Sequence, residues 1–96
     1  MKMFMIAYNS AIESEVMEIL EKYSIESYTK WTQVQGKGKM SGTHLGTNIW
    51  PGENSVLFCA IEGEKTENLI KLIKEHRKKS GNLGIKAFVW NLEEIT

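Results

Sequence analysis

The stretch KMFMIAYNSAIESEVMEILEKY, residues 2–23, joins two patterns that together decide the fold. Its first part, residues 2–8, is an apolar run of the length of a strand. Ser10 and Glu13 then match the S-x-x-E capping box that begins many helices, and apolar residues follow at helical spacing. The stretch therefore predicts a strand over residues 2–8 and a helix over residues 11–23.

The rest of the chain adds three strands and one helix. We expect a polar strand at a sheet edge over 28–35, a doubly apolar strand over 55–61, a helix over 66–79 that stops at Gly81, and a last strand over 85–92. The order β-α-β-β-α-β predicts an α+β, ferredoxin-like fold, with a four-stranded antiparallel sheet and two helices on one face. We expect residues 1–96 to form one domain.

Both faces of the predicted sheet are apolar. Alternate residues of the strands over 2–8, 55–61 and 85–92 are apolar on either side, yet two helices can cover only one side. At about 25 cal/mol per Å² of apolar area, exposing the second face would forgo several kcal/mol, comparable to the whole stability of a small domain. The pattern therefore predicts self-association, most simply as a closed ring.

Composition narrows the functional classes. The formal net charge is zero, there is one cysteine, and no apolar run suits a signal peptide or a membrane span. We therefore expect a cytoplasmic protein with no membrane segment and no affinity for nucleic acid. All twelve acidic residues are glutamates, and no acid, base and nucleophile set can be found, so neither an enzyme nor a metal site is expected.

One glycine-rich segment, QGKGKMSGTHLGTNIWPG over residues 35–52, is the candidate binding element. It holds five glycines, two lysines and a histidine, and residues 27–52 contain no acid. Backbone N–H groups of a Gly-x-Gly turn can converge on an anion, and lysines add charge, so Gly36, Lys37, Gly38 and Lys39 are candidate phosphate ligands. Alternatively, the glycines only let the loop turn at positive φ while the lysines keep it soluble.

Three segments resemble the PII nitrogen-regulatory signalling proteins. VQGKGKMSG, residues 34–42, resembles the stretch that opens their T-loop, and IKAFVWNLEEI, residues 85–95, is similar to their final strand. SGNLG, residues 80–84, stands where they carry a glycine-rich B-loop. The resemblance covers nearly the whole chain and implies a homotrimer whose sheets face inward, with nucleotides in the clefts between subunits.

The resemblance also implies a function and further site residues. Lys86 aligns with the B-loop lysine of the family, so Gly84 and Lys86 join the candidate ligands. With Met40 in place of the family's glutamine and a shortened loop, we expect a reduced PII-like regulator. It would need no cofactor, bind a small anionic effector such as ATP, ADP or AMP, and act on a partner protein through its loop. The alternative is a CutA-like trimeric scaffold or metal-binding protein without nucleotide binding.

Overall fold

The computed structural model describes residues 1–37, 53–80 and 84–96. The elements, in chain order, are β1 (Lys2–Asn9), a 3-10 turn η1 (Ser10–Ile12), α1 (Glu13–Lys22), β2 (Thr29–Val34), β3 (Asn54–Ile61), α2 (Gly63–Ser80) and β4 (Ile85–Asn91). Each predicted strand and helix is present. The main difference in bounds is that α2 begins at Gly63, before the predicted residue 66, whereas its predicted stop at Gly81 lies outside the described residues.

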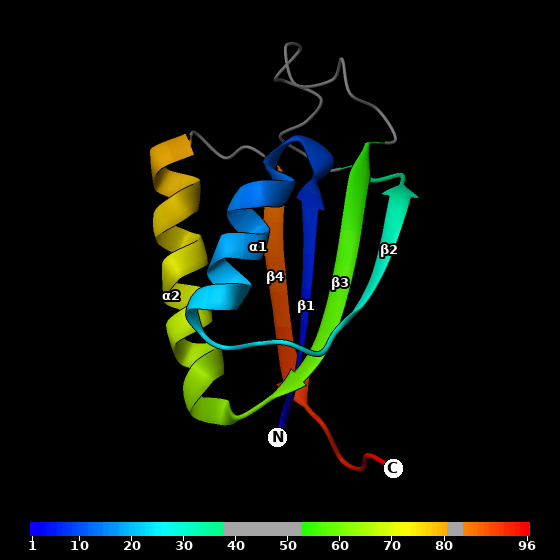
Figure 1. Cartoon of the computed structure of the whole chain (residues 1–96), viewed down its shortest axis with the longest axis vertical. Coiled ribbons are helices and arrows are strands. Elements are labelled where there is room, and N and C mark those ends of the chain that lie inside the picture. Colours follow the sequence, from blue (N-terminus) through cyan, green and yellow to red (C-terminus); the bar gives the residue numbers. More distant parts are fainter. Residues whose placement is uncertain (38–52, 81–83) are drawn as a thin grey trace.

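The four strands form one sheet in the order β2-β3-β1-β4, and every neighbouring pair is antiparallel. Both helices lie on the same face of this sheet (Figure 1). β1 is central and pairs along its length with β3 and β4, so that Phe4 stands between Cys59 and Val89. The ferredoxin-like prediction is confirmed, and β2 lies at a sheet edge as its polar sequence indicated.

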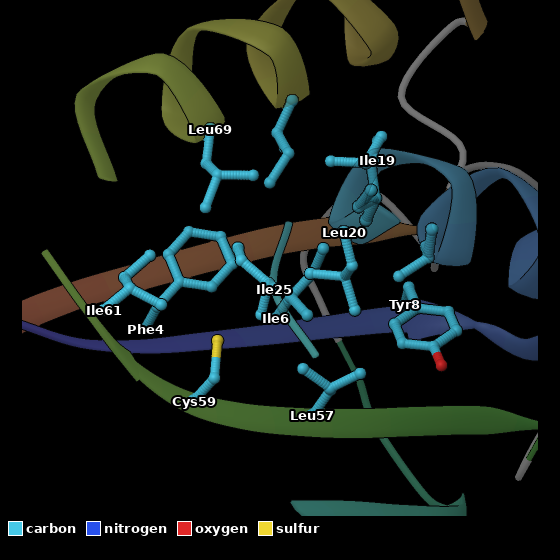
Figure 2. Packing of buried hydrophobic residues seen from close by; sticks show 13 residues of the cluster. Phe4, Ile6, Tyr8, Ile19, Leu20, Ile25, Leu57, Cys59, Ile61 and Leu69 are labelled. Carbon is cyan, nitrogen blue, oxygen red and sulfur yellow. The ribbon is translucent and has the colours of Figure 1, made fainter. Parts of the chain in front are cut away.

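The hydrophobic core lies between the sheet and the two helices. Alternate residues of β1 and β3 point into it, and apolar positions of both helices close it from the other side (Figure 2). The most buried members are Phe4, Ile6 and Tyr8 of β1, Leu57 and Cys59 of β3, Val16 and Leu20 of α1, Leu69 and Ile73 of α2, and Ile85 of β4. One face of β1 and one face of β3 are thus buried within a single copy of the chain.

The predicted capping box from Ser10 to Glu13 is wrong. The 3-10 turn η1 stands between β1 and α1, so the N-cap of α1 is Ile12, which makes no side-chain capping bond. Asn9 caps η1 instead, because its side-chain oxygen accepts a hydrogen bond from the backbone N–H of Ala11 at 2.8 Å. The presence of the helix was predicted correctly, but its N-terminal cap was not.

Candidate functional site

The sheet face away from the helices is apolar and lies open in a single protomer. By strand register it carries Met3, Met5 and Ala7 of β1, Val56, Phe58 and Ala60 of β3, Phe88 and Trp90 of β4, and Trp31 of β2. We call this face of the sheet the open face. Trp31 is 55% exposed, Trp90 44% and Phe88 40%, unusual values for such large apolar side chains. The second apolar face predicted from the strand patterns is therefore present.

Two parallel rows of side chains define the part of the open face nearest the loop. One row runs Trp31, Val56, Ala7, Lys86 from β2 to β4. In the next row Phe58 meets the indole of Trp31 in a T-shaped contact, with ring centroids 5.0 Å apart and an interplanar angle of 87°. Lys86 is exposed at the β4 end of the first row, so a cation borders this apolar surface.

Gly36 and Lys37 follow the end of β2, beside the first residue of β3. A Cβ added to Gly36 would lie 3.6 Å from Nδ2 of Asn54, an ordinary van der Waals contact, and the φ of Gly36 is outside the left-handed region. Neither crowding nor backbone conformation therefore requires glycine at this position. Gly38 and Lys39 lie outside the described residues.

At position 84, by contrast, the backbone conformation and the close approach of Asn9 require glycine. Its φ is +29°, and a Cβ there would lie only 3.2 Å from Cβ of Asn9. The carbonyl of Gly84 accepts a hydrogen bond from the backbone N–H of Asn9 at 2.7 Å, which holds the start of β4 against the end of β1. A structural role is thus enough to explain this glycine.

The described candidate residues gather at one end of the sheet but on opposite edges. Asn54 faces both Val34 and Asn9, and Asn9 bonds to Gly84, so one row links the β2 edge to the β4 edge. Three interstrand spacings separate β2 from β4, roughly 14 Å. A single phosphate group cannot contact Gly36 and Lys86 of the same protomer across that distance.

A partly buried polar cluster on the helix side was not predicted from the sequence. The Tyr8 hydroxyl donates a hydrogen bond to one carboxylate oxygen of Glu13, and Lys30 Nζ donates to the other at 2.6 Å. These contacts join β1, the start of α1 and β2. The contact between Lys30 and Glu13 could not be predicted from the sequence, because the two residues are 17 positions apart in the chain.

The electrostatics of this cluster favour a charged pair beside a neutral phenol. Burial and the adjacent Glu13 carboxylate raise the pKa of Tyr8, so its hydroxyl stays protonated. Burial alone would raise the pKa of Glu13, but hydrogen bonds from Lys30 and Tyr8 outweigh it and lower the pKa. The bond to Glu13 in turn raises the pKa of Lys30.

Two serines extend this polar cluster toward the segment that precedes β3. The hydroxyls of Ser10 and Ser55 lie 3.0 Å apart, and the backbone N–H of Ser10 donates to the carbonyl of Glu53 at 2.7 Å. The cluster therefore fixes both β2, which leads into the glycine-rich segment, and the residues that follow this segment.

Other parts of the described chain offer no competing chemistry. Cys59 is 4% exposed, and burial raises the pKa of its thiol to about 11, so it is a poor nucleophile. Within residues 1–37, 53–80 and 84–96, no three histidine, cysteine or acidic side chains are placed to hold a metal ion. None of the helices in these ranges combines the length and apolar composition of a bilayer span.

A groove of about 270 Å³ lies between α1 and α2. Its polar lining consists of Glu15, Glu18, Lys22, Glu75, His76 and Lys79, over the apolar Ile19 and Leu72. Because three glutamates line the groove together with its two lysines, the groove does not favour an anion in the way that exposed Lys37 and Lys86 do.

Comparison with solved structures identifies the same topology in PII-like proteins. CPII from Thiomonas intermedia K12, a nitrogen regulatory PII-like protein solved with ADP, AMP and bicarbonate, superposes with a TM-score of 0.73 at 16% identity, covering 95% of this chain and 88% of that one. A putative PII-like signaling protein from Thermus thermophilus gives a TM-score of 0.68 at 20% identity, with coverages of 95% and 84%. At these identities the likeness shows the fold.

The family assignment comes from the sequence. No curated protein sequence matches the chain. The family model described as nitrogen regulatory protein P-II matches residues 1–96. Since this match spans every strand and helix described above, the chain belongs to the nitrogen regulatory protein P-II family.

Proposed function

We propose that this chain is a single-domain PII-like regulator rather than an enzyme. It binds a small anionic effector, an adenine nucleotide, in clefts between the subunits of a homotrimer, and it acts on a partner protein through the loop between β2 and β3. The observation that carries the proposal is the placement of Gly36, Lys37 and Lys86 at one end of a sheet whose apolar face is uncovered in one protomer.

Assembly follows from the open face. Its aromatic side chains are too exposed for a protein that stays monomeric, and a second copy is the simplest cover for an apolar surface of this kind. A closed ring would cover the central strands of this face in every copy. It would also place the β2 edge of one subunit within reach of the β4 edge of another.

The polar groups at those edges indicate that the effector is an anion. Gly36 has no conformational need to be glycine, so its bare backbone is free to approach a ligand closely. Lys37 and Lys86 are exposed cations, which favours an anion. Because Gly36 and Lys86 of one protomer are too far apart to share a phosphate, a cleft between copies is the place where both types of group can meet.

The nucleotide assignment draws on the PII-like relative CPII, which was solved with ADP and AMP. Isothermal titration of the purified protein with ATP, ADP and AMP at millimolar concentration tests it, with sedimentation velocity to give the oligomeric state. We expect a trimer that releases or absorbs heat with at least one nucleotide. A trimer silent to all three, but stabilised thermally by divalent metals, would instead support the CutA-like alternative.

A further inference from the structure

Trp31 is the most exposed aromatic side chain of the open face, and packing within the protomer does not explain its position. It lies on the edge strand β2, where a polar or β-branched residue would suffice, and it is 55% exposed. An exposed tryptophan forgoes the free energy that burial of its large apolar surface would contribute. We therefore expect a ligand or partner surface to cover the tryptophan on this edge strand. The inference below rests on the proposed nucleotide-binding function.

Phe58 holds the indole in a defined orientation. The T-shaped contact at 5.0 Å and 87° joins the edge of one ring to the face of the other. Such a contact fixes a ring without sandwiching it, and the large exposed fraction of Trp31 leaves most of the indole accessible. The side chain is therefore arranged as a supported but uncovered flat surface.

A β-bulge brings this surface close to Gly36 and Lys37. Trp31 pairs with Val56 and Val34 pairs with Asn54, so three steps along β2 match two along β3. Gln33, at φ +57°, absorbs the extra residue. Without the bulge, Trp31 and Val34 would point to opposite faces; with it, both lie on the open face.

The resulting separation suits a nucleotide. Gly36 lies against the side chain of Asn54, and Asn54 is two residues from Val56, the partner of Trp31. Two residues of an extended strand span roughly 7 Å. The indole of Trp31 on β2 and the glycine and lysine that follow this strand thus lie at about the spacing between the base and the first phosphates of a nucleotide.

We propose that Trp31 stacks on the base of the bound nucleotide while Gly36 and Lys37 contact its phosphates. Stacking on an aromatic side chain recognises any base by its flat face, so Trp31 would distinguish nucleotides from base-free polyphosphates rather than adenine from guanine. The inference assigns to this chain a residue that selects a ligand carrying a base.

Trp90 supplies a matched control. It is the same residue type on the same face, with 44% exposure, but it stands on the opposite edge strand in the row of Met3 and Ala60. Ala60 is four residues from Val56 along β3, roughly 13 Å farther from the loop end. A substitution of Trp90 therefore perturbs the open face at a position farther from the loop end than the proposed stacking position.

The test measures ATP and tripolyphosphate binding by isothermal titration for the wild type, W31A, W31F and W90F, each first shown to be folded and in the same oligomeric state. We expect W31A to bind ATP about tenfold more weakly, with W31F intermediate and W90F unchanged. Tripolyphosphate binding should be equal in all four. In a W50F/W90F protein, where Trp31 is the sole tryptophan, ATP should quench the fluorescence and tripolyphosphate should not.

The outcomes separate the two proposals. If the wild type binds ATP but W31A binds it equally well and the Trp31 fluorescence does not respond, the stacking role is wrong and the nucleotide function stands. If the wild type binds no nucleotide, the proposed function itself fails. If W31A lowers ATP and tripolyphosphate binding alike, Trp31 supports the site as a whole and does not recognise the base. If W31A dissociates the oligomer, while W31F keeps both assembly and full ATP affinity and ATP does not quench Trp31 in the W50F/W90F protein, Trp31 is an assembly residue.

Discussion

The two faces of the sheet are built from the same strands but depend on different partners. On the face toward the helices, Leu57 and Phe4 have no exposed surface at all, because α1 and α2 complete the packing within one protomer. On the open face, Phe88 and Trp31 keep 40% and 55% of their surface exposed. The first face explains why the chain folds. The open face is not covered within one copy, and it lies next to Gly36, Lys37 and Lys86, the residues proposed to bind the effector.

The sharpest test of this contrast uses neighbours on β3, Leu57 and Phe58, which point to opposite faces. Leu57→Ala removes a side chain with no exposed surface and should lower the free energy of unfolding by about 3 kcal/mol at any protein concentration. Phe58→Ala should instead weaken assembly, so its loss of stability should be smallest at low concentration, where both proteins are monomeric, and should grow as the concentration rises and the wild type assembles. Urea unfolding at several protein concentrations measures both. Equal, concentration-independent losses would show that the two faces do not differ in this way.

A charge in the middle of the open face should break assembly while leaving the protomer folded. Met5 pairs with Phe58 on one side and Phe88 on the other, so Met5→Lys places an ammonium group at the centre of the apolar surface. Sedimentation velocity at micromolar concentration should change from an oligomer to a monomer, with the far-ultraviolet circular dichroism of the wild type. Glu21→Lys, on an exposed position of α1, is the control for an added positive charge. An oligomer that survives Met5→Lys would mean that another surface joins the copies.

The two described glycines of the candidate site should respond differently to one added methyl group. Gly84→Ala places a Cβ 3.2 Å from Asn9 at a φ of +29°, and we expect it to cost about 1–2 kcal/mol of stability. Gly36→Ala meets only an ordinary contact and should change stability by less than about 0.5 kcal/mol. Thermal unfolding measures this difference. In a nucleotide titration, Gly36→Ala should weaken binding more than Gly84→Ala does, because the proposed role of Gly36 is to approach a ligand. Equal thermal effects at both positions would contradict the distinction drawn from the backbone.

Local sequence patterns were sufficient to predict most of the fold. The features that were not predicted depend on contacts between residues that are distant in the sequence. Alternating apolar residues in strands such as β3 are sufficient to predict a sheet with two apolar faces, because side-chain direction has a period of two. The glycines at 36 and 84 look alike in the sequence, however, and only the backbone separates the free position from the constrained one. The bond between Lys30 and Glu13 was equally hidden, since the two residues meet only after the sheet and α1 have packed.

That ion pair should give only a small loss of stability, with a pH dependence that reports on the helix-covered face. Glu13 and Lys30 are partly exposed, so the pair should be worth only about 0.5–1 kcal/mol. The pKa of Glu13 is lowered in the folded state from its ordinary value of 4.5, so its stabilisation is complete above that value and is lost as the pH falls through the lower, folded pKa. The pKa of Lys30 is raised, so its contribution is lost only in strong alkali, above its ordinary 10.5.

Glu13→Gln should therefore lower stability at neutral pH and make the acid limb of the stability curve shallower. Urea unfolding between about pH 3 and pH 7 measures this limb, and Glu21→Gln, an exposed acid on the same helix, is the matched control. A Glu13→Gln protein whose acid limb is as steep as that of the wild type would remove Glu13 as the group that titrates. If the limb does flatten while assembly and nucleotide affinity stay constant, the helix-covered face can be weakened without disturbing the open face. Such independence is expected if the helix-covered face is buried within one protomer and the open face is buried only on assembly.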